Sequence, residues 1–140
     1  MTSFKKILVP LDGSANSFRG LDRAIILARF CHATITGLYV VPMATPAKSS
    51  QISSWEKIFL NNAAKFMKKA KTTAAKNGIL FHDIVVYGEE GVAIVSFSKR
   101  NNFDMIVIGS RGRGAAKEIF LGSVSNYVVH KSKLPVLIVK

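Results

Sequence analysis

Short apolar runs alternate with amphipathic segments along the whole sequence, and this alternation restricts the fold more than any other feature. The run 6–11 (KILVPL) is apolar after its first residue and is closed by the turn-forming residues Asp12-Gly13-Ser14. The run 105–108 (MIVI) has the same character. Continuous apolar runs are typical of strands buried on both faces of a parallel sheet. The alternation therefore predicts one α/β domain whose sheet is covered by helices on both faces.

Three further strands complete the predicted sheet, at residues 33–41, 79–87 and 135–139. The first is rich in β-branched residues, as strands are. The second contains His82 and Asp83, and this polarity suits the edge of a sheet. The third is a run of apolar residues that follows a proline-bounded turn.

Helices are expected between these strands. Ser14 and Ser53 are suitable N-caps, and the pair Glu89-Glu90 favours the positive start of a helix. A short last helix is expected at residues 123–130. The segment 42–50, which holds two prolines and several small residues, is predicted to be a mobile loop.

The length of the chain and its single cysteine narrow the class of protein. The 140 residues, with a mass of 15.3 kDa, suit one domain spanning 1–140. Cys31 has no intramolecular disulfide partner, and one thiol is typical of a reducing interior. No apolar run has the length of a membrane span, and the first residues lack the pattern of a signal peptide. We therefore expect a soluble cytoplasmic domain with no membrane partner.

The chain is strongly basic. Twenty Lys and Arg against eight Asp and Glu give a net charge of +12, which accelerates association with any polyanion. The charge alone does not distinguish between binding of nucleotides, of nucleic acid or of acidic lipid. It is equally compatible with a role in solubility only. Many of the lysines fall on the helix after Ser53, where the simplest interpretation is a solvated face: Lys57, Lys65, Lys68, Lys69, Lys71 and Lys76.

A glycine motif of the form G-x2-G-x9-G-S follows the fourth strand. It consists of Gly109, Gly112, Gly122 and Ser123. Glycines at a strand end let backbone amides approach an anion, and the Gly122-Ser123 pair opens a helix whose unpaired amides favour a phosphate. Arg111 lies within the motif and is a candidate ligand contact, although loop arginines are commonly just exposed. The motif predicts a phosphate site.

Other phosphate and catalytic motifs are not matched. A Walker A loop needs Lys and Ser or Thr after its last glycine, but Gly114 is followed by two alanines. The dinucleotide pattern G-x-G-x-x-G is also missing at this strand end. Cys31 and His32 are adjacent in sequence and point in different directions, so we predict neither a catalytic pair nor a metal site from them.

The sequence resembles the universal stress protein family, in its ATP-binding branch, over nearly the whole chain. The resemblance rests on ILVPLDGS at the start, DMIVIGSRG before the glycine motif, the motif itself and LPVLIV at the end. It implies a three-layer, Rossmann-like sandwich of the adenine nucleotide alpha hydrolase-like type, with a five-stranded parallel sheet of order 3-2-1-4-5. Strands one and four would then end side by side, where such sheets bind ligands.

The resemblance also implies roles for individual residues. Asp12 would contact the ribose of ATP or AMP, the backbone of Val40 would bind adenine, and Pro10 would shape the pocket wall. Glu90 stands where many members have proline, at a helix start that we expect to lie away from the pocket. The phosphate contacts would be Gly109, Gly112, Gly122, Ser123, Val124 and Ser125.

The expected activity is nucleotide binding in a stress-response or regulatory role, without assigned catalytic residues. Hydrolysis needs a base and usually a metal such as Mg²⁺, and the only carboxylate within the glycine motif is Glu118. Slow ATP hydrolysis and nonspecific nucleic-acid binding are the alternatives. The resemblance further implies a homodimer that pairs through the strand Pro135 to Val139.

Overall fold

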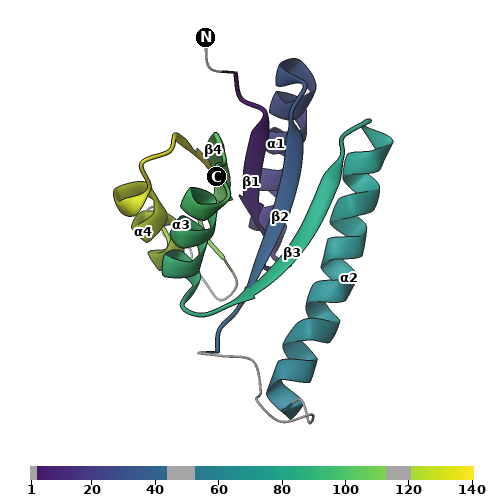
Figure 1. The fold of residues 1–140 in the computed structure, drawn as a ribbon. Coiled ribbons are helices and arrows are strands. Elements are labelled where there is room, and N and C mark those ends of the chain that lie inside the picture. The colour runs from purple at the N-terminus through teal and green to yellow at the C-terminus, as the bar shows by residue number, and fades with distance from the viewer. Residues whose placement is uncertain (1–2, 44–52, 113–120) are drawn as a thin grey trace.

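The computed structural model describes residues 3–43, 53–112 and 121–140. The five strands in these ranges form one parallel sheet in the order β3-β2-β1-β4-β5, with helices on both faces (Figure 1). The three-layer α/β fold and its strand order are thereby confirmed. The elements are β1 Lys6–Pro10, α1 Ala15–Cys31, β2 Thr34–Val41, α2 Ser54–Lys76, β3 Phe81–Tyr87, α3 Glu90–Arg100, β4 Met105–Gly109, α4 Ser123–Lys131 and β5 Val136–Val139.

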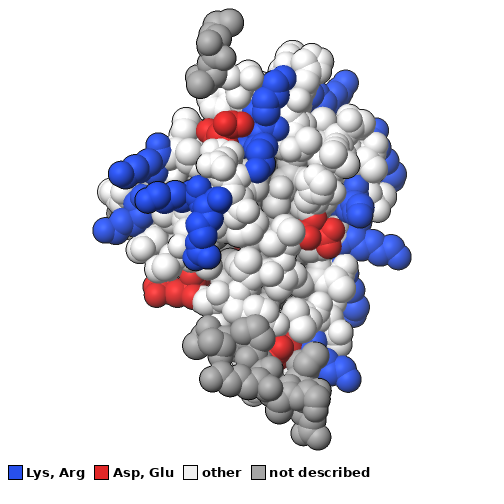
Figure 2. Space-filling view, viewed as in Figure 1, with Lys and Arg blue, Asp and Glu red and all other residues white. Residues whose placement is uncertain are grey.

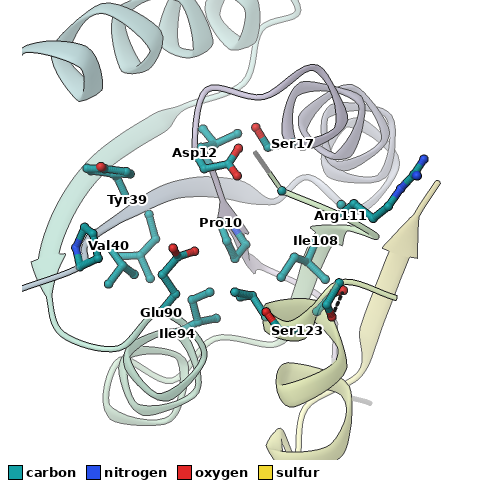
Figure 3. Close-up of a pocket in the computed structure, with 18 of the residues that line it drawn as sticks. Pro10, Asp12, Ser17, Tyr39, Val40, Glu90, Ile94, Ile108, Arg111 and Ser123 are labelled. Carbon is teal, nitrogen blue, oxygen red and sulfur yellow. Dashed lines mark hydrogen bonds between the residues drawn. The ribbon is translucent and has the colours of Figure 1, made fainter. Parts of the chain in front are cut away.

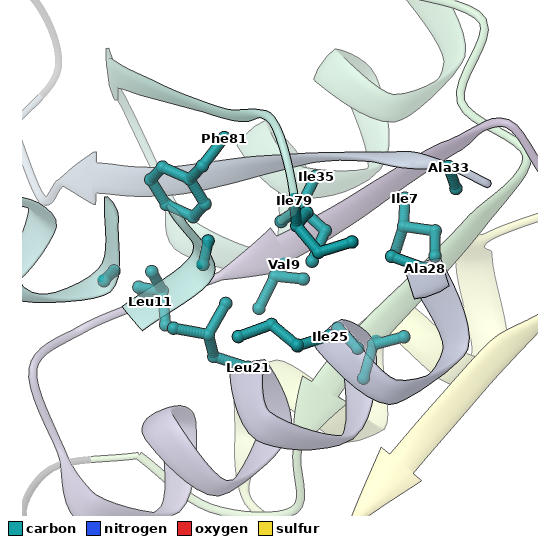
Figure 4. Close-up of a cluster of buried hydrophobic side chains, with 14 of the residues drawn as sticks. Ile7, Val9, Leu11, Leu21, Ile25, Ala28, Ala33, Ile35, Ile79 and Phe81 are labelled. Atoms are coloured by element: carbon teal, nitrogen blue, oxygen red, sulfur yellow. The ribbon is translucent and has the colours of Figure 1, made fainter. Parts of the chain in front are cut away.

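Helices α1 and α2 cover one face of the sheet. Figure 4 shows Leu21, Ile25 and Ala28 of α1 directed toward Ile7 and Val9 of β1, all of them buried. This face explains why the apolar residues of α1 recur at helical spacing. The same cluster includes the following buried residues of α2: Met67, Ala70 and Ala74.

Helices α3 and α4 cover the opposite face. Ile94 of α3 and Val128 of α4 are buried against Leu8, Leu38 and Ile106, whose side chains alternate along the strands with those of the first cluster. Because β1, β2 and β4 are buried on both faces, their sequences show no polar alternation.

The predicted helix caps are present. The Ser14 hydroxyl accepts a hydrogen bond from the Ser17 amide at 3.1 Å, and α1 begins at the next residue. Ser53 caps α2 in the same way, through the Glu56 amide at 3.1 Å. The buried Glu56 side chain also accepts a hydrogen bond from the Tyr87 hydroxyl at 3.1 Å, which ties the start of α2 to the end of β3.

The third strand begins two residues later than the sequence predicts. Ile79 is buried, but its amide donates to the Ala74 carbonyl at 3.0 Å and so completes the turn that ends α2. Gly78 has a φ of +73°, which reverses the chain here. The prediction that this strand lies at a sheet edge is confirmed.

Positive side chains are spread over several elements of the face in Figure 2. The six lysines predicted to form a solvated face on α2 are all exposed. Among the residues that the structure describes, no helix is long and apolar enough to cross a lipid bilayer. The predicted mobile loop 42–50 falls mainly on residues 44–50, outside the described ranges.

Candidate nucleotide site

A cavity of about 600 Å³ opens where β1, β2 and β4 end, with the first turns of α3 and α4 at its side (Figure 3). Strands β1 and β4 are hydrogen-bonded neighbours, so the chain segments that follow them lie across one crevice. The volume is that of a typical small-molecule site. All the predicted site residues line this cavity: Pro10, Asp12, Val40, Gly109, Arg111, Gly112, Gly122, Ser123, Val124 and Ser125.

The glycines of the motif stand where a side chain does not fit. A Cβ on Gly109 would lie 2.6 Å from Oδ1 of Asn16, and a Cβ on Gly112 would lie 2.6 Å from Oδ2 of Asp12. Gly122 is less crowded, with the nearest atom at 3.3 Å. Absence of a side chain lets the backbone of β4 and of the following loop approach α1 and Asp12 closely.

The two parts of the glycine motif are joined through Ser110. Its carbonyl accepts hydrogen bonds from the Gly122 amide at 2.8 Å and from the Ser125 hydroxyl at 2.7 Å. Ser125 is buried and its hydroxyl is therefore occupied by the backbone. Ser123, by contrast, is exposed at the first position of α4. The main-chain amides of a helix's first turn have no acceptor within the helix.

Asp12 is fixed by the turn after β1. Its Oδ1 accepts a hydrogen bond from the Ser14 amide at 2.9 Å, across Gly13, whose φ is +85°. The other oxygen faces Gly112. Asp12 thus lies between the turn after β1 and the loop after β4.

Arg111 contributes to the cavity, but its side chain does not face the apolar walls. In Figure 3 its guanidinium points away from Val40 and Glu90. Its main-chain amide donates to Oδ1 of Asn16 at 2.7 Å.

Asn16 is a site-supporting residue that the sequence reasoning missed. It is buried in the first turn of α1, where its side-chain amide also donates to the Val139 carbonyl at 3.1 Å. The sequence did contain a signal for it: Asn16 is a polar residue on the buried side of α1, and a buried polar side chain needs hydrogen-bond partners. Nothing in the sequence indicated which partners those are.

Glu90 corrects an expectation. It lines the cavity, whereas its place at the start of α3 was predicted to lie away from the pocket. The physical reason is topological: α3 follows a strand of the same parallel sheet, so it begins at the edge where β1 and β4 end. Burial, and then the charge of Asp12, raise the pKa of the Glu90 carboxyl above its ordinary value of 4.5.

Apolar side chains form the rest of the wall, and the sequence did not distinguish them from core residues. Ile94 lies one turn after Glu90, and Phe59 reaches the cavity from α2. Tyr39 also lines it and packs its ring against Phe66 with the centroids 5.3 Å apart. These walls suit a flat, apolar group such as a purine ring.

Cys31 and the three histidines do not line the cavity. No group of three His, Cys, Asp or Glu with metal-binding geometry occurs within the described ranges. Among the residues that the structure describes, the carboxylates that line the cavity are Asp12 and Glu90. Three charged residues that fall within the glycine motif in sequence lie outside the described residues: Arg113, Lys117 and Glu118.

Comparison with known proteins gives one family. The model of the universal stress protein family matches residues 3–140. Universal stress protein YxiE of Bacillus subtilis is 35% identical over 147 aligned positions, covering 98% of this chain and 99% of the relative. Universal stress protein MJ0531 of Methanocaldococcus jannaschii is 31% identical, covering 98% of this chain and 82% of the relative.

Solved structures share the fold. Universal stress protein UspA from Lactobacillus plantarum superimposes with a TM-score of 0.86 at 23% identity, with both chains covered completely. A universal stress protein solved in complex with cAMP has a TM-score of 0.75 at 24% identity, covering 99% of this chain and 98% of that one. One from Archaeoglobus fulgidus in complex with dAMP also has a TM-score of 0.75, at 22% identity, covering 99% and 100% of the two chains.

Proposed function

The chain belongs to the universal stress protein family, and from this premise we propose that it binds an adenine nucleotide, ATP or AMP, and acts as a nucleotide-responsive regulatory protein. The observation that carries the proposal is the convergence of Asp12 and the glycine motif on one cavity at the crevice between β1 and β4. Relatives of the same fold solved with cAMP and with dAMP support an adenine ligand.

In the proposed complex, each part of the ligand occupies a different end of the cavity. The purine lies among the apolar side chains, beside the backbone of Val40, with Pro10 and Ile94 as walls. The ribose lies at Asp12. The phosphates lie against the backbone of Gly109, Gly112 and Gly122, where the amides of Ser123 to Ser125 and the positive end of the α4 dipole stabilise them.

A binding role is favoured over rapid hydrolysis. Asp12 accepts a hydrogen bond from the Ser14 amide and faces the proposed ribose site. We assign no catalytic base among the described residues that line the cavity. Mg²⁺ would be held chiefly by the ligand's own phosphates, since only Asp12 and Glu90 offer carboxylates there among the described residues. Slow hydrolysis and a cytoplasmic location stay predictions.

The decisive test is nucleotide binding to the purified protein. We expect ATP or AMP at millimolar concentration to raise the melting temperature, because a ligand that binds only the folded state stabilises it. Gly122→Asp places a negative charge at the start of α4 and should abolish the shift. Thr72→Asp on the exposed face of α2 adds the same charge elsewhere and should preserve it. Equal melting curves with and without both nucleotides would refute the proposal.

Nucleic-acid binding is the second candidate, and the exposed lysine face of α2 favours it. Such binding would be nonspecific and would weaken steeply with salt, because it rests on phosphate contacts alone. Charge reversal at Lys65, Lys68 and Lys69 should remove it and leave nucleotide binding intact. Gly122→Asp should have the opposite effects.

A further inference from the structure

The Glu90 carboxyl lines the cavity from the first position of α3. Across residues 3–43, 53–112 and 121–140, no side chain or main-chain group hydrogen-bonds or pairs with it. It is nevertheless partly buried, and Figure 3 shows it projecting into the cavity near Val40 and Ile94. Its oxygens are open to solvent rather than buried, so they are available to accept a hydrogen bond from a ligand in the cavity.

The helix does not require this side chain. Glu90 occupies the first position of α3, and the preceding Glu89 is extended, with φ −76° and ψ 127°. Any good helix-starting residue, proline included, suits this position. A carboxyl at this position complements the positive start of α3, and it also projects into the cavity.

The charges around Glu90 define what the ligand must offer. Asp12 faces it across the cavity and is also acidic. The other titratable groups that line this cavity are Tyr39 and Arg111. Glu90 also borders a second, adjoining cavity, whose titratable groups are Glu89 and Tyr127. Beside the Glu90 carboxyl, near Val40 and Ile94, an N–H donor is stabilised, and a group that offers only lone pairs is repelled.

We propose that Glu90 is a specificity-determining residue that accepts a hydrogen bond from the exocyclic amino group of the base, and so selects aminopurine nucleotides. This inference rests on the proposed function and assigns the base contact within the same cavity. An ionised carboxyl is a stronger acceptor than a neutral amide oxygen, and a protonated carboxyl is a weaker one. The selectivity is therefore greatest when Glu90 is ionised.

The test compares ATP with purine riboside 5′-triphosphate, which lacks the 6-amino group, by isothermal titration at pH 7.5. We expect the wild-type protein to prefer ATP by about tenfold or more. The preference should fall about fivefold in Glu90→Pro, with Glu90→Gln between the two. Glu89→Gln is the matched control, because Glu89 is exposed, makes no side-chain cap and does not line this cavity. It should keep the wild-type ratio.

Repeating the titration at pH 5 supplies a second readout. Because the pKa of Glu90 is raised, its protonation should reduce the wild-type preference for ATP as the pH falls, while the ratio of Glu90→Gln stays constant. An unchanged ratio in both variants would overturn the inference and leave the proposed function standing. If the wild-type protein binds neither nucleotide, both fail. Should Glu90→Pro not fold, the isosteric Glu90→Gln decides.

Discussion

Oδ1 of Asn16 accepts a hydrogen bond of 2.7 Å from the main-chain amide of Arg111, and this contact joins the first turn of α1 to the loop that follows β4. The same side chain donates to the Val139 carbonyl at 3.1 Å. One buried amide thus fixes the position of the glycine motif relative to two other elements.

Replacement of Asn16 should loosen the nucleotide site and the fold together. Asn16→Ala leaves the Arg111 amide and the Val139 carbonyl without this partner, which should lower the free energy of unfolding by about 2 kcal/mol. Nucleotide affinity should fall as well, because the loop is no longer held. Denaturant unfolding and titration with ATP measure the two effects. Asn62→Ala, at an exposed position of α2, should leave both unchanged.

Ser123 and Ser125 form a matched pair with different expected outcomes. Ser125→Ala removes the buried hydroxyl that binds the Ser110 carbonyl, so stability should fall by about 1 kcal/mol. Ser123→Ala removes an exposed hydroxyl, so stability should stay within about 0.5 kcal/mol of wild type while ATP affinity falls. Equal loss of ATP affinity without any loss of stability in Ser125→Ala would contradict this assignment.

Stability should depend on pH through Glu90. Burial and the Asp12 charge raise the folded-state pKa of this carboxyl, so the folded protein holds its proton more tightly than the unfolded chain. The stabilising contribution is full below the ordinary pKa of 4.5 and is lost as the pH rises through the folded-state value. Glu90→Gln should therefore melt higher than wild type at pH 7 and similarly at pH 4. Calorimetry without nucleotide tests this, with Glu89→Gln as the control.

The edge strand β5 should mediate a homodimer. Leu137 is 38% exposed in this edge strand, and apolar edges invite pairing with a second copy. Light scattering should then give twice the chain mass of 15.3 kDa. Leu137→Lys should shift the protein toward monomer, and Ile26→Lys on the exposed side of α1 should not. A monomeric wild-type protein would rule the dimer out.

The fold was predictable because its strongest signals are local. The run that forms β1 and the run that forms β4 are apolar on both faces, and Ser14 and Ser53 cap helices as predicted. Errors occurred at a strand boundary, where Ile79 was assigned to β3. Its burial resembles that of a strand residue, but its amide completes the end of α2.

The candidate site was predictable only where its chemistry needs unusual residues. Glycines at fixed spacing and Asp12 in a turn stand out from an average sequence. Phe59 and Ile94 do not, because an apolar side chain that lines a cavity looks like any core residue. Glu90 was misplaced although the predicted parallel sheet already implies that α3 begins at the edge where β1 and β4 end. Local sequence does not tell which side chain of that first turn faces the cavity. That the predicted residues contact a nucleotide stays a prediction.

The hydrogen bonds of the Val139 carbonyl have a practical consequence for work at the bench. This oxygen accepts from the Ser110 amide at 2.7 Å and from Asn16, so the last strand is anchored directly to the glycine motif. Trimming Val139 and Lys140 would remove that anchor. Affinities should therefore be measured on protein that retains these two residues.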